Sequence, residues 1–205
     1  MSAQVNDVFV YDNKKYSISA IENQEMFFDI TDVGISPKPC SSACWRGYIA
    51  VFSIDGENRL VLKELNTNSK DEQLPEINGV KPEFLKLTEK NVDALIKKSG
   101  YTLLLGGTVI YTEVNLPIRY SGKLLITKGF IDDYYIHMGY QSSYAYNEVI
   151  ELTFKDGICT NAEDVSELAK QKRKKHRPQK QFMGFRNSEN WINEMFDLSY
   201  NSKRV

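Results

Sequence analysis

The side chains best suited to binding or acid–base chemistry are concentrated between Arg119 and Tyr146. This stretch holds six of the chain's twelve tyrosines and one of its two histidines, His137. Tyrosine and arginine combine apolar surface with hydrogen-bonding groups, and both are enriched where proteins bind partners. We therefore predict a binding surface or ligand pocket in this stretch. Strand-rich domains also bury tyrosines with satisfied hydroxyls, so that alternative stays open.

A second segment, Cys44–Tyr48, has companion side chains of the same types. We predict one binding site formed by the two segments together, and its residues are Trp45, Arg46, Tyr48, Arg119, Tyr120, Tyr135, His137, Tyr140 and Tyr144. In an enzyme, His137 would be the acid or base and an arginine would hold an anionic group. In a binding protein, the same side chains would contact a partner.

The three cysteines are Cys40, Cys44 and Cys159, and an odd, low count does not indicate a disulfide framework. A zinc site needs four ligands, usually from two close pairs, and only one pair is local here. Cys159 and His137 would complete such a site only if the fold brought them in. Likewise, His137 would activate one of these thiols as a nucleophile only if the fold brought the two side chains together. We expect no metal and no cofactor.

Two pairs of carboxylates have the residue type that glycoside hydrolysis requires. They are Asp29 with Asp32 and Asp132 with Asp133. That chemistry needs two carboxyl groups about 5–9 Å apart across a cleft. Adjacent acids on a strand face opposite sides, so we interpret these pairs as turn residues. The chain has no glycine-rich phosphate loop, and its lack of a catalytic signature favours a non-enzymatic protein.

Charge is divided unevenly along the chain. Residues 170–180 carry seven Lys or Arg and no acid, which leaves 19 basic and 27 acidic residues elsewhere. The sequence thus predicts an acidic body with a basic tail segment. The basic side chains that could bind nucleic-acid phosphates are Lys172, Arg173, Lys174, Lys175 and Arg177. The alternative is a solvated helix end, because no aromatic residue is interleaved among them.

Four hairpins are predicted to position these residues. In each, β-rich runs flank residues that tolerate positive φ, such as Asp-Gly, Gly-Gly or Asp-Asn. The paired runs are Val8–Tyr11 with Tyr16–Ile21, Tyr48–Ile54 with Leu60–Leu65, Tyr101–Leu105 with Thr108–Val114, and Val149–Phe154 with Ile158–Thr160. The glycine pair at 106–107 could instead mark a bulge in one long strand. A further strand, Lys123–Thr127, runs through the tyrosine-rich stretch.

Three helices are predicted from their apolar faces and capping residues, at Thr88–Ser99, Ala162–Lys175 and Ser188–Leu198. Together these elements predict a mainly β (α+β) fold. It would be a meander of antiparallel hairpins forming a sandwich or barrel-like sheet, with one inserted helix and two C-terminal helices. We divide the chain into a β-rich domain at 1–161, with the helical insert near 88–99, and a helical appendage at 162–205.

Composition places the chain among globular proteins, with 41% hydrophobic residues over 205 positions. Its start has no basic region followed by an apolar run, and its apolar runs are far too short to span a bilayer. We therefore expect a cytoplasmic protein with reduced thiols and no membrane partner.

Two stretches together resemble a family of bacterial proteins with no known activity. One is Cys44–Ala50, which leads into the turn at Asp55-Gly56. The other runs from Tyr120-Ser121-Gly122-Lys123-Leu124 through His137-Met138-Gly139-Tyr140 to the strand at 148–154. The likeness covers roughly residues 43–160, without the insert at 66–100. It implies a bacterial origin, a cytosolic location and one structural unit for both stretches.

These observations favour a non-enzymatic bacterial binding module that presents its Tyr/His/Arg-rich surface to a protein partner. An immunity or antitoxin protein is one concrete form, because an acidic protein attracts a basic toxin. The first alternative is an enzyme or small-ligand-binding protein with a pocket at Arg46, Tyr48, His137 and Tyr140. The second is nucleic-acid binding through residues 170–180. The sequence does not indicate an oligomeric state.

Overall fold

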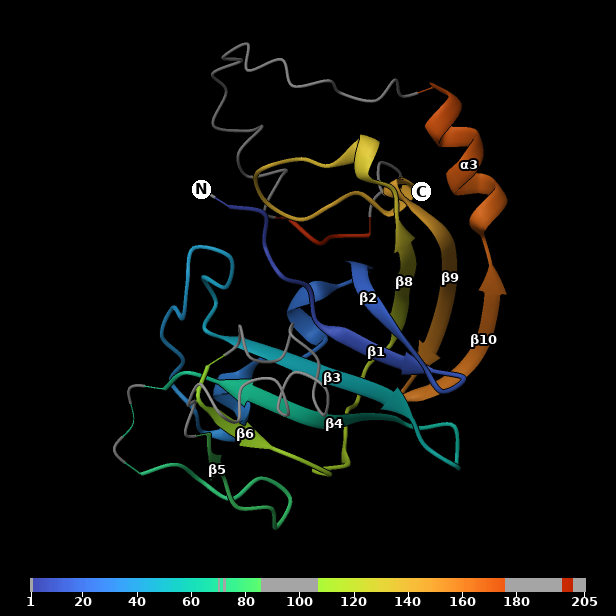
Figure 1. Ribbon diagram of the computed structural model, residues 1–205. Coiled ribbons are helices and arrows are strands. Elements are labelled where there is room, and N and C mark those ends of the chain that lie inside the picture. Colours follow the sequence, from blue (N-terminus) through green and yellow to red (C-terminus); the bar gives the residue numbers. More distant parts are fainter. Residues whose placement is uncertain (1, 70, 72, 86–106, 176–196, 201–205) are drawn as a thin grey trace.

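The computed structural model describes residues 2–69, 71, 73–85, 107–175 and 197–200. Within these ranges the fold is mainly β, as predicted (Figure 1). The strands are β1 (Val8–Tyr11), β2 (Lys14–Ile21), β3 (Tyr48–Ile54), β4 (Leu60–Thr67), β5 (Glu83–Phe84), β6 (Val109–Tyr111), β7 (Leu116–Pro117), β8 (Gly122–Phe130), β9 (Tyr146–Lys155) and β10 (Ile158–Asp164). Four short 3-10 turns and one α-helix, α3 (Ser166–Lys175), complete the described elements.

All ten described strands belong to one mixed sheet in the order β10-β9-β8-β2-β1-β3-β4-β6-β5, with β7 paired to β4. The sheet is not closed into a barrel. The prediction of an antiparallel meander is wrong in two respects. β2 pairs with β8, which is distant in the sequence, and β1 and β3 are parallel neighbours. The long connection between β2 and β3 makes this possible, since parallel strands need a crossover rather than a tight turn.

Three of the four predicted hairpins are confirmed, and their turns explain why they form. Asp12 and Asn13 have φ values of 48° and 56° between β1 and β2, and Asp156 has a φ of 49° between β9 and β10. Positive φ at these short polar residues matches the twist of paired strands. In the fourth hairpin, the run Tyr101–Leu105 lies outside the described residues, and its predicted partner is found as β6, which pairs with β4 and β5.

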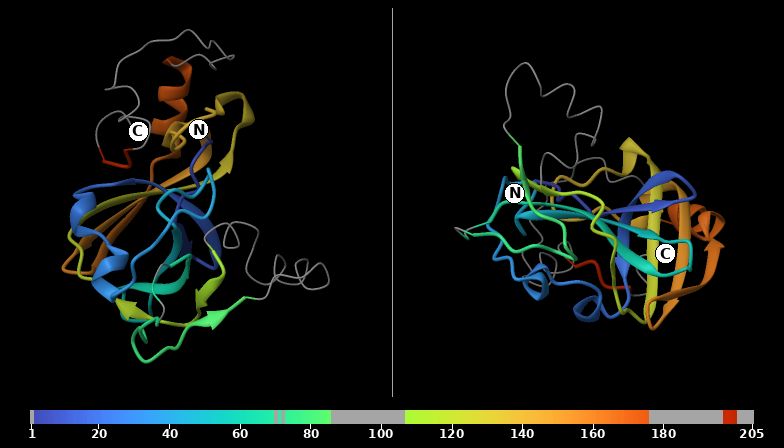
Figure 2. Two further views of the ribbon diagram at one scale, coloured as in Figure 1. Left: turned by 90° about the vertical axis from the view of Figure 1, so that its left-hand side faces the viewer. Right: turned by 90° about the horizontal axis from the view of Figure 1, so that it is seen from below.

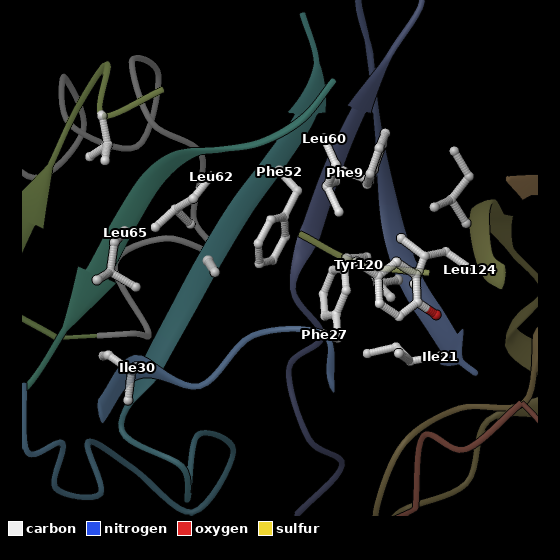
Figure 3. Packing of buried hydrophobic residues seen from close by; sticks show 14 of the residues in the cluster. Phe9, Ile21, Phe27, Ile30, Phe52, Leu60, Leu62, Leu65, Tyr120 and Leu124 are labelled. Carbon is white, nitrogen blue, oxygen red and sulfur yellow. The ribbon is translucent and has the colours of Figure 1, made fainter. Parts of the chain in front are cut away.

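The main core lies against one face of the curved sheet, where alternate residues of several strands converge (Figure 3). Phe27, in the connection between β2 and β3, packs against Phe52 and Tyr120 with ring centroids 4.8 and 5.1 Å away. In β9, the alternate residues Leu152 and Phe154 belong to this core. Burying each such side chain stabilises the fold by about 1.5–3 kcal/mol. A second buried cluster lies on the opposite face, under α3.

The helices agree only in part with the sequence. The predicted start at Ala162 is wrong, because β10 continues through Asp164 and α3 begins at Ser166. Pairing with β9 satisfies the backbone of residues 162–164, and Asp164 accepts a hydrogen bond from the Ser166 amide at 2.9 Å. The predicted helix at 88–99 lies outside the described residues.

The last described residues of the chain form hydrogen bonds with the end of strand β2. Most of the predicted helix at 188–198 lies outside the described residues, but its last residue, Leu198, is not helical. The amide of Ile21 donates to the Leu198 carbonyl at 2.6 Å, and the amide of Tyr200 donates back to Ile21 at 2.7 Å. Leu198 is 2% exposed and belongs to the main core. The division of the chain at residue 161 stays a prediction.

Candidate functional site

A two-point ion pair joins Arg46, in the loop before β3, to Asp7, just before β1. Its hydrogen bonds are 2.6 Å from Nη1 to Oδ2 and 2.8 Å from Nη2 to Oδ1. The side chain of Asp7 is 6% exposed and that of Arg46 is 22% exposed. Burial by itself lowers the pKa of Arg46, but the Asp7 carboxylate outweighs it and holds that pKa above its ordinary value. The pair is fixed and neutral overall, so Arg46 is not free to clamp an anionic ligand.

Two predicted tyrosines gather at this ion pair. The guanidinium carbon of Arg46 lies 4.8 Å from the ring centroid of Tyr48. The charges of Arg46 and Asp7 both act on the pKa of Tyr140. Burial is the main reason that the pKa values of Tyr48 and Tyr140 are raised, so both hydroxyls stay protonated at neutral pH. The sequence therefore correctly associated Arg46, Tyr48 and Tyr140, although it gave no signal for Asp7.

The N-terminal segment connects this cluster to the tyrosine-rich stretch. The amide of Gln4 donates to the carbonyl of Gly139 at 2.8 Å, and its side-chain oxygen accepts from the amide of Trp45 at 3.2 Å. Residues 2–7 thus lie between the loop before β3 and the connection that follows β8 (Figure 1). The indole of Trp45 is 54% exposed beside this segment.

His137 does not join the arginine cluster. It is exposed, and its Nδ1 lies 3.5 Å from the hydroxyl of Tyr135, which is itself 48% exposed. Gly139, with a φ of 71°, separates it from the buried Tyr140. The predicted pocket at Arg46, Tyr48, His137 and Tyr140 is therefore not formed as one unit.

A different pocket, of about 260 Å³, opens beside Tyr135. The residues around it include Gln4, Asn6, Phe130, Tyr135, Gln141 and Tyr146. They come from the N-terminal segment, the end of β8, the start of β9 and the connection between those strands. The sequence identified only Tyr135 among the pocket residues. Phe130 and Tyr146 lie inside the aromatic stretch that it singled out, whereas nothing local pointed to Gln4 or Asn6.

Two predicted surface residues lie elsewhere. Tyr120 is 1% exposed, and its hydroxyl donates to the carbonyls of Glu22 and Lys123 at 2.5 and 2.9 Å. It is a core residue, which corrects its assignment to a binding surface. Arg119 is exposed beside the Gly157 turn, at the opposite end of β8 from His137. Arg119 therefore cannot share a site with His137.

Two basic residues of α3, Lys172 and Arg173, contact the body. Arg173 donates from Nη1 to the carbonyls of Tyr144 and Tyr146 at 2.8 and 2.5 Å. The ammonium of Lys172 lies 6.0 Å from the ring centroid of Tyr144. In the left-hand view of Figure 2, α3 and the connection between β8 and β9 lie together above the strands. Lys174 and Lys175 are exposed, and Arg177 lies outside the described residues.

The structure does not support catalysis by the predicted cysteines or by the carboxylate pairs. Burial raises the pKa of Cys40 to about 12 and also raises that of Cys44, so both thiols are poor nucleophiles. Across the described part of the chain, no three His, Cys, Asp or Glu side chains are grouped to hold a metal ion. The carboxylate pairs are turn residues, as predicted, because Asp29 caps one 3-10 turn and Asp132 with Asp133 begins another.

The chain matches no family model, no curated protein and no solved structure. Among the described residues, no helix is long and apolar enough to cross a membrane.

Proposed function

We propose that this chain is a non-enzymatic binding module that takes a protein partner on one aromatic face. We define the aromatic face as Trp45, Tyr135 and His137 together with the pocket between the N-terminal segment and Tyr135. The observation that carries the proposal is the exposure of two large aromatic residues that both adjoin Gln4: the Trp45 amide donates to the Gln4 side chain, and Tyr135 lines a pocket with it. Exposed aromatic side chains are costly in water and are enriched at the centres of protein interfaces.

The scaffold beneath the aromatic face is rigid enough to present it. The Arg46–Asp7 pair fixes the loop that carries Trp45, and Gln141 fixes the connection that carries Tyr135 by exchanging two hydrogen bonds with Ile136 at 2.9 and 2.7 Å. A preformed surface binds with a smaller loss of conformational entropy than a mobile one. Both loops are therefore suited to recognition.

Charge favours a basic partner. Outside residues 170–180 the chain has 27 acidic and 19 basic residues. Such an excess speeds association with proteins of opposite charge. An immunity or antitoxin role, and the bacterial origin implied by the resemblance of residues 43–160, belong to this proposal. Nucleic-acid binding through residues 170–180 is supported less, because Arg173 is engaged with the backbone of the body.

The proposal is tested by capture from a lysate of the source cells with quantitative mass spectrometry. Wild-type protein should retain one partner at near-equal molar amount. Trp45→Ala and Tyr135→Ala should each weaken retention about tenfold or more, as expected for aromatic side chains at an interface centre. Phe84→Ala is the matched control, because Phe84 is 68% exposed on a distant edge strand. The proposal is wrong if no partner is retained, or if all four proteins retain it equally.

A further inference from the structure

The pocket beside Tyr135 is walled by three aromatic rings. Phe130 ends β8, Tyr146 begins β9, and Tyr135 lies in the connection between them. The centroids of Phe130 and Tyr135 are 6.4 Å apart with ring planes at 88°, and those of Phe130 and Tyr146 are 5.2 Å apart at 66°. No residue that lines the pocket has a charged side chain.

These angles fit a compact, rounded group better than a flat one. A flat ligand is held best between parallel rings, whereas steeply inclined rings surround a rounded group. A cation within roughly 6 Å of a ring centroid is attracted to the face of that ring.

The polar groups of the pocket argue against a ligand rich in hydroxyls. The Gln4 amide nitrogen donates to the carbonyls of Ser2 and Ser42, and its oxygen accepts from Trp45. Gln141 is similarly engaged with Ile136. Much of the amide hydrogen-bonding capacity is therefore already used to hold the loops together. Ring faces are then the main recognition groups.

Two exposed carboxylates beside Tyr135 suit a positive ligand, while the cationic Arg173 is bound to the backbone carbonyl of Tyr146. Asp132 and Asp133 are exposed in the 3-10 turn that directly precedes Tyr135. Carboxylates at that position attract a cation toward the rings without entering the pocket themselves.

We propose that this pocket binds an alkylammonium group. This inference rests on the proposed function when the group is a lysine or methylated lysine side chain of a basic partner. The same chemistry occurs in a free small molecule such as choline. A methylated ammonium from either source presents a rounded, weakly hydrated cation to Phe130, Tyr135 and Tyr146, whereas an unmethylated lysine ammonium is strongly hydrated and should bind more weakly.

The test uses choline chloride and its neutral analogue 3,3-dimethylbutanol, which has the same shape without the charge. Each is titrated into the isotope-labelled full chain at constant ionic strength, and the backbone NMR signals of Gln4, Asn6 and Gln141 are followed. Choline should bind with a Kd in the millimolar range, and the neutral analogue should bind about tenfold more weakly or worse. Equal binding of the two compounds, or no response to about 100 mM choline, overturns the inference.

Substitutions at Tyr135 check the role of the ring. Tyr135→Phe should keep choline binding because the ring face is retained, whereas Tyr135→Ala should lose it about tenfold. Because Tyr135 is about half exposed, neither change should unfold the protein, and the NMR spectrum verifies this. Loss of choline binding in Tyr135→Phe together with tight binding of the neutral analogue would contradict a cation–π site.

The failures of the two proposals are distinguishable. Trp45 does not line the pocket, so Trp45→Ala should bind choline normally while losing the protein partner. Choline binding without any captured partner overturns only the proposed function, and a captured partner without choline binding overturns only this inference. Binding of an N-acetylated trimethyllysine amide at least as tightly as choline assigns the cation to a protein. Tighter binding of choline assigns it to a small molecule.

Discussion

The guanidinium of Arg46 and the carboxylate of Asp7 meet across 39 residues of sequence. Oδ1 of Asp7 also accepts a hydrogen bond from the amide of Ala50 at 2.7 Å, inside β3. One carboxylate therefore holds the loop before β3, the start of that strand and the N-terminal segment in a fixed arrangement. Both sides of the aromatic face depend on this contact, since residues 2–7 also bind Gly139.

Replacing Arg46 should destabilise the fold strongly. Arg46→Met leaves the Asp7 carboxylate, 6% exposed, without its counter-charge, and we expect the free energy of unfolding to fall by about 2–4 kcal/mol. Urea denaturation at pH 7 measures the change. Arg59→Met is the control, because Arg59 pairs with Asp55 on the surface and its loss should cost less than about 1 kcal/mol. Equal losses in the two variants would contradict a structural role for the Arg46–Asp7 pair.

Gly47 should tolerate no side chain. Its φ is 77°, and a Cβ there would lie 2.2 Å from the carbonyl oxygen of Lys38. Because that neighbour is backbone, Gly47→Ala should lower the free energy of unfolding by at least about 2–3 kcal/mol and displace Arg46. Gly56→Ala, with open space around it, should change stability by less than about 0.5 kcal/mol. Thermal unfolding followed by circular dichroism compares the variants, and a harmless Gly47→Ala would refute the close approach to Lys38.

Cys40 should react slowly with alkylating reagents while the protein is folded. Burial raises the pKa of this thiol from 9.0 to about 12, so little reactive thiolate exists at pH 8. We expect iodoacetamide to modify Cys40 about 100-fold more slowly in the folded protein than in urea, with a rate that keeps rising as the pH is raised. Peptide mass spectrometry measures the rate at each pH. Rapid alkylation of the folded protein at pH 8 would reopen the possibility of a thiolate nucleophile.

Arg173 should anchor α3 to the body. Its guanidinium donates to two carbonyls, so Arg173→Ala should lower the local stability of the helix by about 1–2 kcal/mol. Hydrogen exchange in the Ser166–Lys175 amides measures this effect. Lys174→Ala is the matched control on the exposed side of the helix and should leave exchange unchanged. Equal loosening of the helix in the control would contradict an anchoring role for the contact of Arg173 with Tyr144 and Tyr146.

The sequence was most informative where structure is local. β-rich runs and turns with positive φ predicted β1–β2, β3–β4 and β9–β10, because both signals are local in the sequence. The start of α3 was misplaced because residues 162–164 can form either a helical first turn or a strand end. Pairing with β9 decided in favour of the strand.

Only part of the candidate site could be predicted, because sequence signals are informative mainly about local structure. Residue types drew attention to Trp45, Arg46 and the tyrosines around His137. They could not separate Tyr120, which is buried, from Tyr135, which is half exposed, because both are tyrosines in one aromatic stretch. The partners Asp7 and Gln4 lie in an N-terminal segment with no motif.

By itself, the sequence determined a mainly β chain, most of its hairpins and the residue types that gather in two segments. The tertiary structure alone decided that β1 lies parallel to β3, that Arg46 pairs with Asp7, and that Tyr140 turns inward while His137 stays exposed. Strand pairing across long connections is chosen by the burial of apolar surface over the whole domain. That choice then fixes which charged and aromatic groups meet, and no local pattern records it.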